Sequence, residues 1–327
     1  MRVVIIGAGL SGLIAARELT AAGVEVIVLD KGRSPGGRLA TRRIGGATLD
    51  HGAQFFTVRS PAFATQVDDW QERGLVHVWN HGFTTPDAND ADADGYPRYV
   101  ATNGMNSLAK DLAVDVDVRC STMVFAIRRD IETGTVTVVI DDGTVLDTDA
   151  VIVTTPLPQA FALMIDGNIE LDEALFRTSY DRTIGLLVHL DGPSALPASG
   201  GVQNPDEVFS FIGDNAAKGV SAEPAVTFHA NPVWSEAHWD DDNTALVEQL
   251  TAAAATWLGE AKIIERSLKK WRLATPRSIW PDPCWTTANG RVVVAGDAFA
   301  GPKVEGAHNS GLAAAHALLD SPSAATQ

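Results

Sequence analysis

The stretch Arg2-Val3-Val4-Ile5-Ile6-Gly7-Ala8-Gly9-Leu10-Ser11-Gly12 decides the fold of this chain. Its β-branched first half predicts a buried strand of the kind that a parallel sheet covers on both faces. The three glycines permit, in order, a tight turn, a close approach of the backbone to a pyrophosphate, and packing of a helix on the strand. We therefore predict a dinucleotide site whose first residues are Gly7, Gly9, Leu10, Ser11 and Gly12.

The next elements complete a nucleotide-binding unit. A helix is expected over 11–22, with Gly23 ending it, and a second strand over 24–29. The helix directs unpaired N–H groups and its positive end at the phosphates. Asp30 follows the glycines by about twenty residues, where a carboxylate accepts hydrogen bonds from ribose hydroxyls and repels a 2′-phosphate. NADP is therefore not expected in this site.

The segment Lys31-Gly32-Arg33-Ser34-Pro35-Gly36-Gly37-Arg38 distinguishes FAD from NAD. A plain NAD-binding domain would enter its second helix here. The diglycine instead lets the chain pass close to a long cofactor, and Arg38 offers a planar fork to phosphate oxygens. Lys31, Gly37 and Arg38 join the candidate cofactor-binding residues.

A second glycine signature lies near the C-terminus. A buried strand is expected over 291–295, then Gly296-Asp297, then a helix over 304–319. Asp297 can bond a ribityl or ribose hydroxyl. Small residues at 307, 310, 311 and 314 share one helix face, which permits close approach by a flat ring or, alternatively, tight helix–helix packing. The positive helix N-terminus would stabilise a reduced, anionic flavin.

Together these motifs resemble the FAD-dependent amine oxidase superfamily, and within it the small renalase-like bacterial proteins. The resemblance also covers Leu49–Phe56, Asn103–Leu108 and Trp271–Pro276, where Leu273 replaces the family's aromatic residue. It implies that the backbone of Val124 bonds adenine. The further cofactor-binding residues that it implies are Gly52, Ala53, Gln54, Phe55, Gly296, Asp297, Glu305, Gly306, Ala307 and Ser310.

The resemblance implies an α/β fold with a Rossmann-type FAD-binding domain and a second, substrate domain of antiparallel sheet plus helices. The FAD-binding domain would comprise residues 1–57, 100–170 and 288–327, and the substrate domain 58–99 and 171–287. Pattern agrees at one point, because alternation over 135–140 and the turn Asp141-Asp142-Gly143-Thr144 predict a hairpin.

Composition limits the function classes. The chain has 327 residues, 45% of them hydrophobic, and a formal net charge of −16, which argues against a nucleic acid or an acidic membrane as partner. The length favours two domains. No apolar run suggests a membrane span and no signal peptide is evident, so a cytoplasmic location is expected. The two cysteines form no Cys-x-x-Cys pair, and the acidic stretch 90–95 has Ala101 where a calcium loop needs glutamate, so no metal is expected.

FAD is expected to be noncovalent, because residues 285–327 contain no cysteine; His51 and His308 are the histidines available for a link. Six of the eight tryptophans lie between 234 and 285, and aromatic residues here serve either a core or a pocket. Loop-breaking residues lie close to Trp234, Trp271 and Trp280, which favours a place in a pocket for these three. The candidate catalytic residues are Gln54, Trp234, Trp271 and Trp280.

The resemblance implies an oxidase that takes a hydride from a dihydronicotinamide, such as an isomer of NADH or NADPH, to flavin N5 and passes electrons to oxygen, giving peroxide. Such a small-molecule substrate needs no prior deprotonation, which suits a sequence without an evident general base. The alternatives are oxidation of a small amine, a non-catalytic FAD-binding protein, and an NAD-dependent dehydrogenase.

Overall fold

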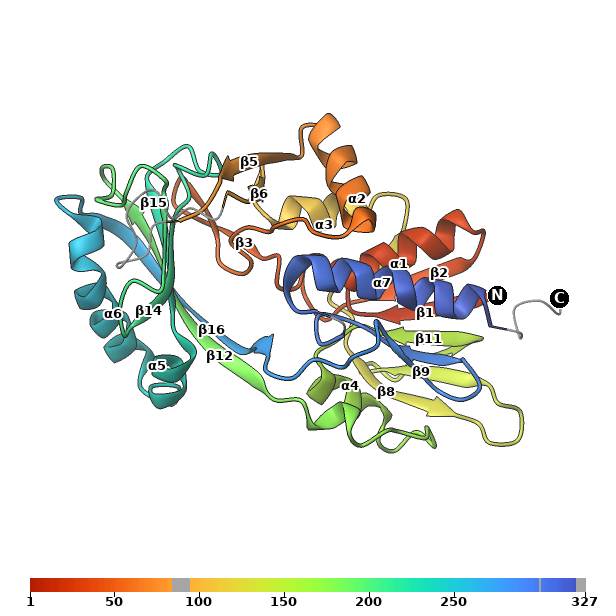
Figure 1. Ribbon diagram of the computed structural model, residues 1–327. Helices are drawn as coiled ribbons and strands as arrows, with labels where there is room; N and C mark the ends of the chain where they lie inside the picture. Colours follow the sequence, from red (N-terminus) through yellow and green to blue (C-terminus); the bar gives the residue numbers. More distant parts are fainter. Residues whose placement is uncertain (84–94, 300, 322–327) are drawn as a thin grey trace. The chain divides into compact units, whose positions relative to one another are not determined.

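The computed structural model describes residues 1–83, 95–299 and 301–321 (Figure 1). It divides into two compact units, which we describe separately. Unit 1 comprises Met1–Gly37, Leu108–Ser179 and Pro276–Gln327, and unit 2 comprises Arg38–Ser107 and Tyr180–Thr275. The acidic stretch 90–94 lies outside the described residues.

Unit 1 is built on a six-stranded sheet of order β17-β18-β11-β1-β2-β7. The first strand pairs in parallel with β2 and β11, and β18 continues the parallel set beyond β11. The side chains from Val3 to Ile6 are buried, which confirms the parallel strand covered on both faces. The strands are β1 (Arg2–Ile6), β2 (Glu25–Leu29), β7 (Asp117–Arg119), β11 (Ala150–Val153), β17 (Trp285–Thr286) and β18 (Val292–Val294).

Two helices of unit 1, α1 (Leu10–Ala21) and α7 (Lys303–Leu319), lie side by side (Figure 1). A Cβ added at Gly311 of α7 would lie 2.4 Å from the Ser11 carbonyl oxygen of α1, so the two backbones touch there. Ala314, one turn further, is fully buried. Tight helix packing, the alternative that the sequence left open, therefore accounts for this part of the small-residue face.

The rest of unit 1 contains the predicted hairpin. Its strands β9 and β10 pair antiparallel with Val139 opposite Val145, and β8 adds a third strand. These elements are β8 (Val124–Arg129), β9 (Val136–Ile140) and β10 (Val145–Thr148), with α4 (Leu157–Met164) and the short helix η2 (Leu175–Arg177) following. One of the places where the chain passes from one unit to the other falls within α3 (Asn106–Leu112).

Unit 2 is built on a five-stranded sheet of order β13-β14-β15-β12-β16, in which the pairs β13/β14, β14/β15 and β12/β15 are antiparallel. The strands are β12 (Tyr180–Leu190), β13 (Gly201–Gln203), β14 (Phe209–Asp214), β15 (Ala225–Ala230) and β16 (Ile263–Pro276). The small ladders are β3 (Thr41–Ile44) with β4 (Ala47–Asp50) and β5 (Val76–Asn80) with β6 (Arg98–Ala101). The helices are α2 (Pro61–Glu72), α5 (Pro232–Ala237) and α6 (Asn243–Leu258).

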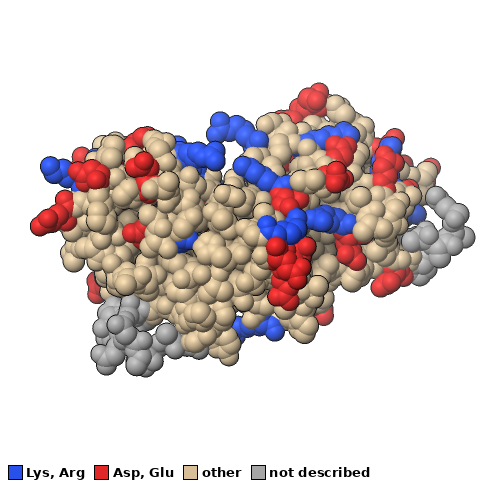
Figure 2. Space-filling model, turned by 90° about the horizontal axis from the view of Figure 1, so that it is seen from above, with Lys and Arg blue, Asp and Glu red and all other residues tan. Residues whose placement is uncertain are grey.

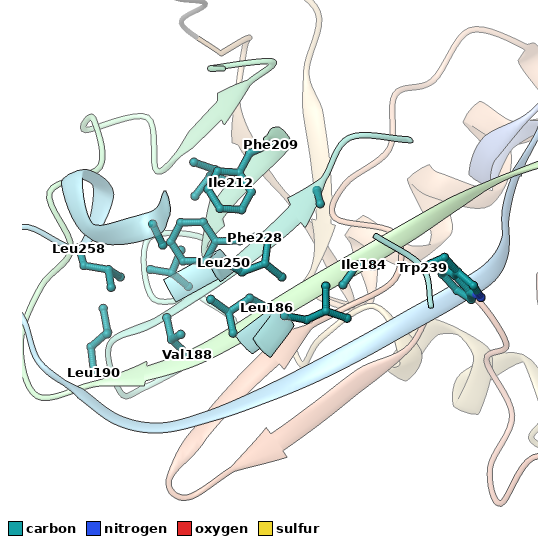
Figure 3. Close-up of a cluster of buried hydrophobic side chains, with 14 residues drawn as sticks. Ile184, Leu186, Val188, Leu190, Phe209, Ile212, Phe228, Trp239, Leu250 and Leu258 are labelled. Atoms are coloured by element: carbon teal, nitrogen blue, oxygen red, sulfur yellow. The ribbon is translucent and has the colours of Figure 1, made fainter. Parts of the chain in front are cut away.

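The core of unit 2 joins this sheet to α6 (Figure 3). Alternate side chains of β12, from Ile184 to Leu190, are buried with Leu250 and Leu258 of α6. Period-two alternation on a strand places them on one face. Asp242 caps the start of α6, where its carboxylate accepts from the backbone N–H groups of Thr244 and Ala245.

Charged side chains of both signs are mixed on the surface. Lys and Arg side chains on the face in Figure 2 lie among Asp and Glu rather than in one basic patch. Among the described residues, no helix combines the length and the apolar character that crossing a bilayer requires. The same residues contain no group of three or more His, Cys, Asp or Glu side chains placed to hold a metal ion.

Candidate functional site

The glycine turn at the start of unit 1 is closed by its neighbours. Gly7 has a φ of +109°, a conformation that favours glycine, and its N–H donates to Leu29 O at the end of β2. A Cβ on Gly12 would lie 2.0 Å from Gly7 O, so α1 begins against the turn itself. By contrast, a Cβ on Gly9 would meet no protein atom within 4 Å. The turn thus requires glycine at positions 7 and 12 for its own packing, but not at position 9.

The diglycine segment lies beside this turn. Gly36 N donates to Ala8 O at 2.9 Å, and a Cβ on Gly37 would be 3.5 Å from the Gly9 Cα. Residues 31–40 contain no helix, as expected for the FAD pattern. Lys31 in this segment is exposed.

The carboxylate of Asp30 bonds both the glycine turn and the segment that follows β2. One carboxylate oxygen accepts from Ala8 N at 2.7 Å, and the other from Gly32 N at 2.6 Å. Thr122 N donates to the Asp30 carbonyl, so the segment after β7 closes over the same residue. A carboxylate oxygen has more than one acceptor site, so ribose hydroxyls can still donate to Asp30.

Two buried hydroxyls at this edge of the sheet fit a polar ligand. Ser11 Oγ, in the first turn of α1, and Thr155 Oγ1, just after β11, have no hydrogen-bond partner among the described residues. Buried polar groups are normally paired. Both lie where the carboxyl ends of parallel strands meet helix N-termini, the usual place of a nucleotide in such sheets. Together with the space at Gly9, they show that the residues present fit a dinucleotide.

The C-terminal signature is held by Ser310. Its hydroxyl accepts from Gly296 N at 2.9 Å and donates to Pro283 O at 2.6 Å. Gly296 has a φ of +143°, and a Cβ on Gly306 would lie 1.7 Å from Gly301 O. Ser310 thus fixes the turn after β18, and its role toward the cofactor stays a prediction.

A second cluster lies in unit 2, around the loop that follows β4. Three successive carbonyl oxygens of this loop accept from side chains: Asp50 O from Gln54 Nε2 and Thr227 Oγ1, both at 2.8 Å, and Gly52 O from Gln54 Nε2 at 3.1 Å. The third, His51 O, accepts from Trp271 Nε1 at 2.8 Å and lies 3.2 Å from His229 Nε2.

The loop also needs glycine at position 52. A Cβ there would be 1.9 Å from Arg38 O, and Ala53 N donates to the same oxygen at 2.8 Å. The guanidinium of Arg38 in turn donates to Ala274 O at 3.1 Å. Residues 38, 50–54 and 271–274 therefore form one bonded group within unit 2.

Cations lower the pKa values of the two histidines at this loop. Burial, with the cations Lys269 and Arg42 and with His229 nearby, lowers the pKa of His51 to about 4. Burial also lowers the pKa of His229 to about 4, against the opposing hydrogen bond to the His51 carbonyl and with a smaller lowering by the charge of Lys218. Lys269 Nζ also lies 4.6 Å from the centre of the Trp271 ring. Both imidazoles are thus neutral near pH 7 and are weak proton acceptors there.

The three candidate tryptophans have different surroundings. Trp271 stacks on His51, with 5.5 Å between ring centres, whereas Trp234 of α5 stacks on His238 and packs against the buried cluster of unit 2. Trp280 belongs to unit 1, where it bridges to Phe299. Of the three, the structure places Trp271 against the loop after β4.

The remaining candidates keep the status of predictions. Val124 begins β8, opposite Ile140, and is 9% exposed. Asp297 is buried, and Glu305 and Ala307 are half-buried in the first turns of α7. Gln54 is 6% exposed, and its amide bonds protein groups, which favours a positioning role over contact with substrate.

Two residues that support the glycine turn and the loop after β4 could not be identified from the sequence. Thr154 donates to the Gly7 carbonyl at 3.0 Å, and Lys218 donates to Gln54 at 2.7 Å. The only signal for Thr154 was its place at the end of a buried strand. Lys218, in a loop 164 residues from Gln54, gave no local signal.

Family models match most of the chain. The model for a flavin containing amine oxidoreductase matches residues 62–319, and the model for an NAD(P)-binding Rossmann-like domain matches residues 5–70. Curated relatives match over short segments: a hydroxyneurosporene desaturase of Rubrivivax gelatinosus is 43% identical over 58 residues, 18% of this chain and 11% of the relative. A putative flavin-containing monoamine oxidase of Mycobacterium tuberculosis is 49% identical over 53 residues, 16% of this chain and 12% of the relative.

Solved structures share the fold over nearly the whole chain. A putative protoporphyrinogen oxidase from Exiguobacterium has a TM-score of 0.73 at 13% identity, covering 97% of this chain and 98% of the other. A putrescine oxidase, solved with putrescine bound, has a TM-score of 0.73 at 15% identity, covering 98% and 99%. These likenesses confirm the α/β architecture with a Rossmann-type domain and antiparallel sheets.

Proposed function

Because the chain belongs to the flavin-containing amine oxidoreductase family and is an FAD-dependent oxidoreductase, we propose that it oxidises a dihydronicotinamide, in the manner of renalase-like proteins. Bound FAD supplies the acceptor for a hydride at N5 and passes the electrons to oxygen, giving peroxide. The chain's own residues bind, orient and shield the two reactants.

The glycine turn and Asp30 are assigned to the ADP half of the cofactor. The N-terminus of α1 presents unpaired N–H groups to the pyrophosphate, and the absence of a Cβ at Gly9 leaves room for it. Ser11 Oγ can donate to a phosphate oxygen, which would satisfy that buried hydroxyl. Arg38 stays assigned to the phosphate oxygens of the cofactor, and the loop after β4 is assigned to the flavin and substrate side.

The choice of substrate rests on the charge around the loop after β4. Lys269 and Arg42 both lower the pKa of His51, and His51 and His229 are neutral at pH 7. A protonated amine would meet like charge from Lys269 and Arg42, and neither imidazole is an effective base to deprotonate it. A dihydronicotinamide carries anionic phosphates and releases a hydride without first losing a proton. The positive charge favours it over an amine such as putrescine.

Anaerobic reduction of the bound flavin tests this proposal. We expect the 2- and 6-dihydro isomers of NADH or NADPH to bleach the flavin rapidly, and a panel of primary and secondary amines to leave it oxidised. Rapid bleaching by an amine alone would establish amine oxidation instead. A flavin that no compound reduces would indicate a non-catalytic FAD-binding protein.

A charge variant sharpens the test. Lys269→Gln is expected to weaken dihydronicotinamide binding by about tenfold, and added salt should reduce this difference because it screens exposed charges. Lys262→Gln, just before β16, is the matched control and should bind as the wild type does. Equal binding by both variants would contradict an electrostatic role for Lys269.

A further inference from the structure

Unit 2 buries a lysine whose charge the proposed reaction does not use. Lys218, in the turn between β14 and β15, is 1% exposed, and its Nζ lies 3.8 Å from Oδ2 of Asp50, which is fully buried. Burial lowers the pKa of Lys218 to about 8, against the opposing charges of Asp50 and Asp214, and burial raises the pKa of Asp50 against the charge of Lys218. A buried ion pair is a weak source of stability, because desolvation offsets the attraction. Its presence therefore needs another explanation.

The hydrogen bond from Lys218 fixes the orientation of an amide. Lys218 Nζ donates to Gln54 Oε1 at 2.7 Å. An ammonium can only donate, so the amide atom that faces it must be the oxygen. The Gln54 Nε2 group is thereby directed the other way, toward the carbonyl oxygens of Asp50 and Gly52.

The Gln54 amide holds together the loop Asp50–Gln54, whose His51 carbonyl also accepts from Trp271. With Nε2 of Gln54 on both Asp50 O and Gly52 O, the His51 carbonyl between them is presented to Trp271 Nε1. A flipped amide would put its oxygen against two carbonyl oxygens and its NH2 group against the ammonium. Asp50 O would keep its bond from Thr227, but Gly52 O and the Gln54 amide would lose theirs. Because the ammonium can only donate, the observed orientation of the Gln54 amide is the one in which both ends of the amide are hydrogen-bonded.

Asp50 keeps the ammonium in place. Its Oδ1 accepts from Thr41 Oγ1 at 2.6 Å and from Met105 N at 2.8 Å, and its backbone N donates to Asn215 Oδ1 at 3.1 Å. Oδ2 has no hydrogen-bond partner among the described residues and faces Lys218. Hydrogen bonds thus fix Asp50 at Oδ1 and at its backbone N, and its Oδ2 sets the position of the Lys218 ammonium.

We propose that Lys218 is a positioning residue, which acts through the Gln54 amide to hold the loop Asp50–Gln54 in the conformation that receives FAD. The inference rests on the proposed function, which assigns this loop to the flavin side. Lys218 itself contacts neither reactant in this account.

Three variants test the proposal by FAD titration and by the flavin absorption spectrum, with no substrate present. Lys218→Met alone leaves Asp50 without a counter-charge and is expected to lose stability. Asp50→Asn combined with Lys218→Met removes both charges at similar volume, so we expect its unfolding free energy to return close to the wild-type value. Its affinity for FAD should nevertheless stay about tenfold weaker and its flavin spectrum should remain shifted, because Gln54 is no longer oriented.

Gln54→Glu isolates the amide. The new carboxylate still accepts from Lys218, but it cannot donate to the carbonyls of Asp50 and Gly52. We expect a folded protein with the same weak FAD binding as the double variant, while Lys262→Met, a control outside the network, binds FAD normally. Gln54→Glu also decides the matter where the double variant does not fold.

The opposite results overturn the inference. Wild-type FAD affinity and flavin spectrum in the folded double variant, or in Gln54→Glu, would show that the buried pair is only structural. Neither measurement includes a substrate. Failure of dihydronicotinamides to reduce the wild-type flavin would therefore reject the proposed function without touching this result.

Discussion

Gly52 is the residue at which the loop after β4 is most tightly constrained. Its Cβ position lies 1.9 Å from Arg38 O, a backbone atom that cannot rotate away. In Gly52→Ala the chain must shift, and overpacking of this kind costs about 1–3 kcal/mol. We expect a lower unfolding midpoint and weaker FAD binding, measured by thermal denaturation and FAD titration.

The matched control is Gly192→Ala, also in unit 2. A Cβ there meets no protein atom within 4 Å, and its φ is not in the left-handed region. Stability and FAD affinity should match the wild type. Wild-type stability and FAD affinity in Gly52→Ala would contradict the close approach of Gly52 to the Arg38 carbonyl.

The residues that sequence could identify are those with local signatures. Gly7, Gly9, Gly12 and Asp30 have a fixed spacing, because one turn and one strand–helix–strand unit set it. Lys218 and its partners have none. Their contacts join segments far apart in the chain, and a lone buried lysine reads in sequence as a surface residue.

At the scale of elements, the packing of α7 on α1 depends on Gly311. Its Cβ would lie 2.4 Å from Ser11 O. In an exposed helix, alanine would be more stable than glycine by about 1 kcal/mol. We expect Gly311→Ala to lower the unfolding free energy instead, which denaturant titration can measure. A stabilised variant would contradict the close contact between the two helices.

Elements with strong punctuation were predicted within about one residue. The helices predicted over 11–22 and 304–319 are α1 (Leu10–Ala21) and α7 (Lys303–Leu319), and Gly23 after α1 has a positive φ, which glycine favours. The small-residue face of α7 was ambiguous. A sequence shows that the side chains on such a face are small, but it does not show what packs against them. In the structure the backbone of α1 packs against Gly311.

At the scale of the whole molecule, two histidines make stability depend on pH. The folded-state pKa values of His51 and His229 are about 4, below the unfolded value of about 6.5. Between these values the unfolded chain binds more protons, so the stability contributed by the neutral imidazoles is present above pH 6.5 and is lost as the pH falls toward 4. We expect the unfolding free energy to fall from pH 6.5 to pH 5 at saturating FAD.

His229→Gln tests the origin of this slope. The amide can still donate to His51 O but does not titrate, so the loss of stability below pH 6.5 should be smaller than in the wild type. His81→Gln replaces an exposed histidine and serves as the control. An unchanged slope in His229→Gln would assign the pH dependence to other groups.

The opening turn is assigned to the pyrophosphate of FAD, and binding of the whole cofactor depends on it. Gly9 gives the most direct test, because its φ is −78° and a Cβ there meets no protein atom within 4 Å. The measurement is FAD binding to the FAD-free Gly9→Ala protein, beside Gly192→Ala. We predict an unfolding free energy within about 1 kcal/mol of wild type and FAD affinity weaker by about tenfold or more. Wild-type affinity in Gly9→Ala would place the cofactor elsewhere.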